Sequence, residues 1–156
     1  MGNFKIKSIE DVETLLQELN EFIQSQKKAT KIKHFTDVKT FEDACKYSGD
    51  NPDDILRFRD PETDEDFYYD SLFKLRYISN VIRGDWKPNW SDKNETKYYA
   101  YFRYDPKTSA FVFLVTGYVW TDSNSTVGSR LCFPSSEMAE YFGKQFIDLH
   151  NQILLK

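Results

Sequence analysis

Hydrophobic residues recur every three or four positions in several stretches of the chain, and this spacing predicts amphipathic helices. The first helix begins after Ser8 and leads into a lysine-rich connector, and a short helix runs from Thr40 to Gly49. A third helix is expected over about residues 67–83, and a long final helix over about residues 136–154. The inward positions of the three longer helices are Ile9, Val12, Leu15, Leu16, Leu19, Phe22 and Ile23, then Tyr68, Leu72, Leu75, Ile78 and Ile82, and finally Met138, Phe142, Phe146, Leu149 and Ile153.

The hydrophobic period shortens to two residues after the third helix. Residues 97–104 place Tyr98, Ala100, Phe102 and Tyr104 on one face and Lys97, Tyr99, Tyr101 and Arg103 on the other. This alternation is typical of a half-covered strand. The turn "DPKTS" follows, and "AFVFLVTGYVW" is apolar on both faces, which predicts a strand in the centre of the sheet. "SRLCF" predicts a third, short strand.

These elements predict an α+β fold. An antiparallel sheet of about three or more strands packs against the N-terminal helices and a long C-terminal helix. The chain has no internal repeat and no low-complexity linker, so we expect a single domain over residues 1–156.

Local signals indicate where several elements begin and end. Thr40 opens "TFED", an N-cap with an acid three residues later, and Gly49 ends that helix. Asn51 and Pro52 are a cap and a first helical residue. Gly143, inside the final helix, predicts a close approach of another segment to the helix backbone.

The composition indicates a chain that buries a core without a metal or a disulfide framework. Aromatic residues make up 17% of the sequence, and each ring can bury on the order of 150–250 Å². The two cysteines, Cys45 and Cys132, are interpreted as buried thiols in a reducing compartment. Neither a secretory signal nor a membrane-spanning stretch is expected.

Charge is unevenly distributed along a chain whose net charge is −4. Residues 50–70 contain nine acidic residues and two arginines, whereas residues 27–39 contain five lysines and one acid. We interpret both segments as solvated surface, and an interaction face is the alternative. The acidic segment is expected to form a loop over residues 57–66.

No sequence signature of a catalytic, cofactor or metal site is present, and we predict none of the three. The carboxylates of "DPETDED", residues 60–66, lack the glycine of a calcium loop. The loop "SNSTVGSR" lacks the lysine of a phosphate-binding P-loop, although Arg130 could contact an anion. An enzyme with a site assembled around Asp122 and Arg130 is kept as a third hypothesis.

Aromatic and basic residues alternate through "WKPNWSDKNETKYYAYFRY", residues 86–104. Tyrosines beside Lys97 and Arg103 would suit stacking on nucleobases. The alternative is packing, because a tyrosine can bury its ring and leave its hydroxyl in water. The candidate surface for a ligand or partner comprises Trp86, Trp90, Tyr99, Tyr101, Arg103, Trp120, Asn124 and Arg130.

Three segments, "KTFEDACKYSG", "WKPNWSDKNETKYYAYF" and "SNSTVGSRLCFPSSEMAEYFGKQFIDL", resemble segments of a group of small uncharacterised proteins from gut Bacteroidetes and their bacteriophages. The resemblance covers about residues 36–155 in the same order. It implies that residues 1–35, the first helix and the basic connector, are a peripheral addition to the domain. Pro134 stands where that group suggests a basic residue. The resemblance implies a bacterial cytoplasmic location with phage or mobile-element ancestry, virion association being the alternative location, and it carries over no functional residue.

The sequence therefore favours a non-enzymatic accessory protein that binds another protein, without a cofactor and without a membrane. The identity of the partner does not follow from the sequence. The alternative hypothesis is a single-stranded nucleic-acid-binding protein that uses the aromatic and basic face of the sheet.

Overall fold

The computed structural model describes residues 12–19, 32–56, 60–120 and 131–155. Its elements are η1 (Phe35–Asp37), α2 (Phe41–Ser48), α3 (Pro52–Ile55), α4 (Asp64–Arg83), β1 (Lys97–Asp105), β2 (Ala110–Val119), α5 (Ser136–Gln145) and α6 (Ile147–Leu154). Residues 12–19 are helical, as the sequence predicts. The prediction that Val12, Leu16 and Leu19 face inward is wrong, because all three side chains are exposed. The predicted cap Ser8 lies outside the described residues, and the single-domain interpretation stays a prediction.

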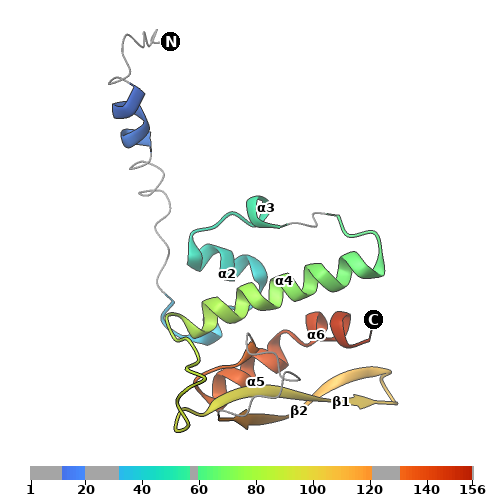
Figure 1. Cartoon of the computed structure of the whole chain (residues 1–156). Helices are drawn as coiled ribbons and strands as arrows, with labels where there is room; N and C mark the ends of the chain where they lie inside the picture. The colour runs from blue at the N-terminus through green and yellow to red at the C-terminus, as the bar shows by residue number, and fades with distance from the viewer. Residues whose placement is uncertain (1–11, 20–31, 57–59, 121–130, 156) are drawn as a thin grey trace.

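The elements form three layers, with a sheet, a middle layer of α5 and α6, and an outer layer of α4 with α2 (Figure 1). Helix α5 contacts both strands, whereas α6 contacts β2 and α4. The core lies between these layers, and its fully buried residues include Val38, Leu75, Ile78 and Phe133. The α+β class predicted from the sequence is therefore confirmed.

The predicted ends of the short helices are confirmed. Thr40 caps α2 by accepting from the Asp43 N–H at 3.1 Å, and Asp43 accepts from the Thr40 N–H in return. Gly49 ends α2 with a φ of 76°, a conformation that favours glycine. Asn51 caps α3, and Pro52 is its first residue.

Helix α4 begins earlier than the hydrophobic period predicts. Thr63 caps it in the same way as Thr40 caps α2, with Asp66 as the reciprocal partner at 3.0 Å. Part of the expected acidic loop is therefore the first turn of α4, where the helix dipole stabilises carboxylates. On the inward side Leu75, Ile78 and Ile82 are buried, as predicted.

The sheet is smaller than predicted. Within the described residues it has two strands, β1 and β2, which pair antiparallel from Lys97–Val119 to Asp105–Ala110. The expected third strand is reduced there to one bridge, in which Phe133 and Tyr98 exchange two backbone hydrogen bonds. The prediction that β2 is central is wrong, because among these residues only β1 pairs with it.

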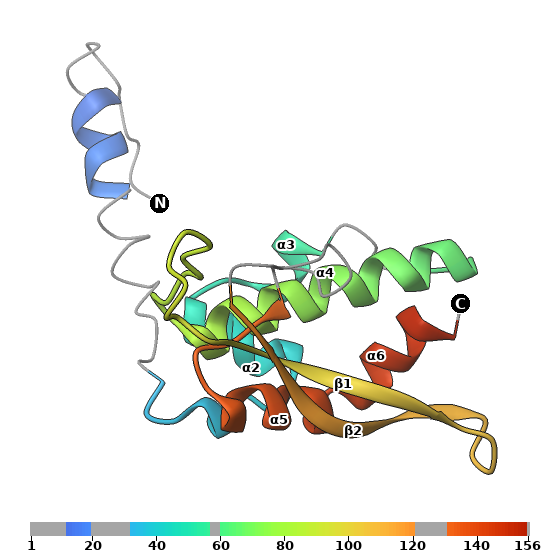
Figure 2. The same cartoon turned by 60° about the horizontal axis from the view of Figure 1, so that its bottom comes forward.

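One face of the sheet is covered and the other is open. Both strands lie on the same side of the helices, and no described helix crosses their outer face (Figure 2). Ala100 and Phe113 mark the covered face, because both contact Gly143 of α5. Tyr101 and Val115 are paired on the opposite, outer face.

The C-terminal helix is also shorter than predicted, since it is divided at Phe146 into α5 and α6. Phe146 has φ −108° and ψ 30°, and its side chain is buried. The break lets α5 follow the sheet while α6 packs on α4. The hydrophobic spacing continues through Phe146, so periodicity did not show the break.

Gly143 makes the close approach that the sequence predicts. A Cβ at this position would lie 2.5 Å from the Cβ of Ala100 and 2.8 Å from Cδ2 of Phe113. Real Cβ atoms do not come this close to other carbons, so α5 packs on the sheet at a distance that only glycine permits.

No helix of the described residues is long and apolar enough to span a membrane.

Candidate functional site

Only some of the aromatic and basic residues predicted on the outer face of β1 are exposed. Tyr101 is 53% exposed, and Arg103 is also exposed. Tyr99 is half-buried, and its ring covers Gly117 on β2, where a Cβ would lie 2.4 Å from the ring carbon Cζ. Tyr99 therefore packs on its own sheet, and Tyr101 with Arg103 remains available to a partner.

Lys97, the other basic residue of this predicted face, is fully buried. Its Nζ donates to the backbone carbonyls of Asn89 at 2.6 Å, Glu95 at 2.8 Å and Asp92 at 3.3 Å. The Trp90 ring lies 5.5 Å from the same atom, which is a cation–π distance. Lys97 thus holds the loop of residues 89–96 in place, and its charge is not available for a phosphate.

The tryptophans divide into two kinds. Trp86 and Trp90 are half-buried in the loop before β1. Trp120 is 52% exposed, and its ring meets the exposed Tyr118 ring edge-on at a centroid distance of 5.2 Å. Asn124 and Arg130, together with Asp122 of the enzyme hypothesis, lie outside the described residues.

A β-bulge produces a surface feature that sequence reasoning missed. Tyr101 pairs with Val115 while Phe102 pairs with Phe113, so Leu114 is an extra residue of β2. A bulge of this kind turns two successive side chains toward the same side. Leu114 and Val115 are accordingly 44% and 51% exposed. The signal in the sequence was the apolar character of both faces of β2. In a sheet that is covered on one side only, the second apolar face of β2 is left exposed.

These residues make one continuous surface, which we call the outer sheet face and define as Tyr101, Arg103, Leu114 and Val115. Val112, the cross-strand partner of Arg103, extends it. Arg103 forms no ion pair with any described residue. The outer sheet face therefore combines exposed apolar side chains with an unpaired guanidinium.

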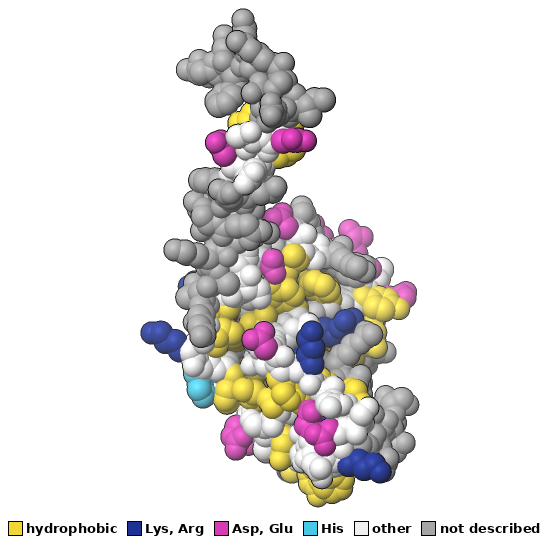
Figure 3. Space-filling view, turned by 60° about the vertical axis from the view of Figure 1, so that its left-hand side comes forward, with side chains coloured by type: hydrophobic (Ala, Val, Ile, Leu, Met, Phe, Trp, Pro, Cys, Tyr) yellow, Lys and Arg dark blue, Asp and Glu magenta, His cyan; other side chains and the backbone are white. Residues whose placement is uncertain are grey.

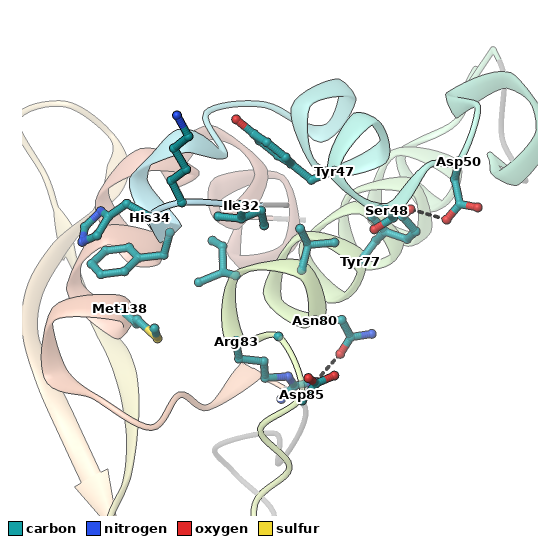
Figure 4. Close-up of a pocket in the computed structure, with 15 residues that line it drawn as sticks. Ile32, His34, Tyr47, Ser48, Asp50, Tyr77, Asn80, Arg83, Asp85 and Met138 are labelled. Atoms are coloured by element: carbon teal, nitrogen blue, oxygen red, sulfur yellow. Dashed lines mark hydrogen bonds between the residues drawn. The ribbon is translucent and has the colours of Figure 1, made fainter. Parts of the chain in front are cut away.

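A groove of about 660 Å³ lies elsewhere, between residues 32–35, the end of α2 and the second half of α4 (Figure 4). Its Tyr77 hydroxyl donates to Asp50 at 2.5 Å. Burial, and after it this hydrogen bond, raise the pKa of Tyr77. Tyr77 is therefore a neutral donor that joins α4 to the end of α2, and it is unsuited to act as a base.

Arg83 and Lys33 are the cations that line this groove, and the Arg83 guanidinium is already hydrogen-bonded. Its guanidinium donates to Asn80, one turn earlier on α4, and to the Cys132 carbonyl at 3.4 Å. Burial lowers the pKa of Arg83. Its hydrogen bonds connect α4 to the segment before α5, which indicates a structural role.

Among the side chains that the structure describes, the surface on this side of the molecule has no extended region of one charge. Figure 3 shows hydrophobic side chains interspersed with both basic and acidic ones. Nucleic-acid-binding faces normally concentrate basic residues. The face in view therefore gives no support to a phosphate-tracking surface.

An apolar cavity of about 400 Å³ lies beside β1 and is lined by residues of β1, α4, α5 and α6, among others. Its lining comprises Leu72, Tyr99, Ala100, Tyr101, Phe102, Phe111, Leu131, Phe142, His150, Ile153 and Leu154. His150 is the one ionisable side chain of this lining other than the tyrosines. Burial lowers the pKa of His150 to about 4, so the imidazole is neutral at pH 7.

The thiols and carboxylates do not assemble into a reactive centre among the described residues. Cys45 and Cys132 are buried thiols, as predicted. Burial raises the pKa of Cys45 to about 11 and also raises the pKa of Cys132, so both are poor nucleophiles at neutral pH. No group of three or more His, Cys, Asp or Glu side chains in the described ranges is arranged to hold a metal ion.

Comparison of the chain with protein-family models, with curated protein sequences and with solved structures found no match. The outer sheet face and the cavity beside β1 are therefore interpreted from their own geometry.

Proposed function

We propose that this chain is a non-enzymatic accessory protein that binds another protein through the outer sheet face. The observation that carries the proposal is the bulge, which exposes Leu114 and Val115 next to Tyr101. Adjacent exposed apolar side chains of this size are typical of interaction surfaces. Tyrosine and arginine, here Tyr101 and Arg103, are with tryptophan the residues enriched among those that dominate binding energy.

The partner is expected to present an apolar surface with a carboxylate near its edge. The apolar part would cover Leu114 and Val115, and the carboxylate would pair with Arg103. A planar guanidinium can bind a carboxylate through two parallel hydrogen bonds. A charged partner group is favoured over a neutral one because Arg103 has no ion-pair partner among the described residues.

The experiment compares Val115→Asp with Tyr69→Asp. Tyr69 is a matched control, because it is 46% exposed but lies on α4, in the layer farthest from the sheet. Both variants and the unchanged chain are immobilised, and proteins retained from a bacterial lysate are quantified. We expect Val115→Asp to retain at least tenfold less of the partner, and Tyr69→Asp to retain the normal amount. Equal retention by all three proteins, or retention of nothing by the unchanged chain, contradicts the proposal.

We further propose that the chain acts in a bacterial cytoplasm and originates from a phage or mobile element. The support is the resemblance of residues 36–155 to small proteins of gut Bacteroidetes and their bacteriophages. The test is the position of the gene, which should lie among phage or mobile-element genes. A position within a conserved chromosomal operon would contradict this origin.

A further inference from the structure

The edge of β1 that faces away from β2 carries backbone groups without partners among the described residues. On this edge the Tyr98 N–H donates to the Phe133 carbonyl at 2.9 Å, and the Phe133 N–H donates to the Tyr98 carbonyl at 2.8 Å. In an antiparallel strand every second residue directs its N–H and C=O to the same side. Ala100, Phe102 and Tyr104 therefore direct theirs to the same edge. Within the described residues these three form no backbone hydrogen bond with a third segment.

Two further observations define this edge. Phe111 is the cross-strand partner of Tyr104, and its own backbone groups bond to Asn151, on the side away from β1. Tyr104 and Phe111 are therefore a pair that does not bond across the hairpin, which leaves the backbone groups of Tyr104 on the free edge. An antiparallel continuation of the isolated bridge would place Leu131 opposite Ala100, but no backbone hydrogen bond joins these two residues.

The cavity beside β1 lies along this open edge. It is lined by four consecutive residues of β1, 99–102. Consecutive residues of a strand point to opposite faces, so all four can line one cavity only where the cavity meets the edge of the strand. Its other walls include apolar residues of two helices, Leu72 of α4 with Ile153 and Leu154 of α6. The edge thus presents backbone donors and acceptors next to an apolar cavity.

The two edges of the hairpin differ in this respect. The edge of β2 is blocked at Phe111 by the Asn151 side chain, and proteins commonly block uncovered edges. The edge of β1 has no such block at residues 100–104 among the described residues. An open edge with room beside it for alternate side chains is the arrangement through which several kinds of domain bind an extended peptide as an added strand.

We propose that the open edge of β1 receives an extended segment of the protein partner as an added antiparallel strand. Every second side chain of this segment is apolar and enters the cavity beside β1. The residue opposite Arg103 is acidic, because it lies on the same face as an exposed guanidinium that forms no ion pair with any described residue. This inference rests on the proposed function, since it assigns the added strand to the partner that covers the outer sheet face.

The probe is the peptide acetyl-VEVTV-amide, whose valines would lie opposite residues 104, 102 and 100 and whose glutamate would lie opposite Arg103. Binding to the unchanged chain is followed by NMR of the backbone amides of β1. We expect the Ala100 and Phe102 amides to shift, because they gain hydrogen bonds. The Tyr101 amide should shift much less, because it is directed to β2. The peptide acetyl-VKVTV-amide should bind about threefold more weakly, because like charges then lie opposite each other.

Methylation of single peptide nitrogens separates strand addition from simple apolar binding. The third residue of the peptide would direct its N–H to the Phe102 carbonyl, so methylation of this nitrogen should weaken binding about tenfold. The fourth residue would direct its N–H away from β1. Methylation there adds the same methyl group as a matched control, and it should change the affinity by no more than about twofold.

The proposal is wrong if acetyl-VEVTV-amide leaves the Ala100 and Phe102 amides unshifted, as it would if this edge is already covered in solution. It is also wrong if the two methylated peptides bind equally, or if the lysine peptide binds as tightly as the glutamate peptide. Any of these results, together with loss of the partner in Val115→Asp, would remove only the added strand. Equal retention of lysate proteins by Val115→Asp and the unchanged chain would instead remove the outer sheet face as the binding site, whatever the peptides do.

Discussion

Asn151 on α6 makes with Phe111 on β2 the pair of hydrogen bonds that a neighbouring strand would make. The Phe111 N–H donates to Asn151 Oδ1 at 2.7 Å, and Asn151 Nδ2 donates to the Phe111 carbonyl at 3.0 Å. An uncovered strand edge can pair with another chain, and proteins commonly block such edges. The Asn151 amide therefore closes the edge of β2 at this residue and also ties α6 to the sheet.

Replacing Asn151 with alanine should lower the free energy of unfolding by about 1–3 kcal/mol, because two hydrogen bonds to a half-buried backbone are lost. Chemical denaturation measures this change, and hydrogen exchange at the Phe111 amide should accelerate. Gln145→Ala is the control, since it removes one exposed side-chain bond to the Lys39 carbonyl. A loss no larger than that of the control would show that the Asn151 contact contributes little.

Gly143→Ala should lower the free energy of unfolding by about 1–3 kcal/mol through overpacking. The opposing effect is helix propensity, because alanine favours a helix by about 1 kcal/mol over glycine. If the variant is instead more stable than the unchanged chain, α5 and the sheet move apart at little cost to make room for the methyl group. The contact with the Ala100 Cβ at 2.5 Å is the shortest one that the new methyl group meets. Adding Ala100→Gly should therefore recover part of the loss, which thermal and chemical denaturation of the single and double variants can measure.

The sequence predicted the elements where local chemistry decides them. The Thr40 cap, the Gly49 end of α2 and the close approach at Gly143 all follow from side-chain size and hydrogen bonding over a few residues. The start of α4 was missed although Thr63 and Asp66 have the same cap pattern as α2. There the acidic composition was interpreted as a solvated loop, whereas its charges stabilise the first turn of the helix.

The features that were not predicted depend on contacts between distant segments. The break at Phe146 follows from packing on two different layers, and the hydrophobic spacing is the same with or without it. The extra residue Leu114 changes which side chains face outward, and alternation along β2 does not show a bulge. Lys97 was assigned to a ligand surface because the alternation of residues along β1 places it on the same face as Tyr99 and Tyr101. That alternation does not show that a loop covers Lys97.

Lys97→Met should destabilise the chain by roughly 2–3 kcal/mol, because the charged donor shared by three carbonyls is lost. The loop of residues 89–96 should loosen, and the fluorescence of Trp90 should shift toward that of a solvated ring. Lys93→Met is the control, since Lys93 lies in the same loop and is exposed. Equal stability of the two variants would mean that the Lys97 ammonium does not organise the loop.

Single-stranded nucleic acid should bind weakly or not at all. Of the two cations predicted on the stacking face, Lys97 is buried, and the Tyr99 ring is packed over Gly117. The chain also carries a net charge of −4, which opposes association with phosphates. A thymidine oligonucleotide at low salt should therefore leave the tryptophan fluorescence unchanged. Quenching that disappears in added salt and in Arg103→Glu would establish the nucleic-acid alternative instead.

The burial of His150 predicts that acid destabilises the fold between about pH 6.5 and pH 4. The folded state holds the pKa of His150 at about 4, below the ordinary value of 6.5 that the unfolded chain has. The unfolded state therefore takes up the proton first as the pH falls. The contribution of His150 to the free energy of unfolding is complete above pH 6.5. It declines as the pH falls from 6.5 to the pKa of the folded state.

The full effect of the imidazole is roughly 3 kcal/mol, as 1.36 kcal/mol for each pH unit between the two pKa values. Protonation of carboxylates also changes the free energy of unfolding toward the acid end of this range. The informative quantity is therefore the difference in that free energy between the unchanged chain and His150→Phe at each pH. The free energy of unfolding of His150→Phe should fall less steeply from pH 7 to pH 4.5, because phenylalanine takes up no proton. Parallel profiles for the two proteins would mean that the imidazole is in contact with water in the folded state.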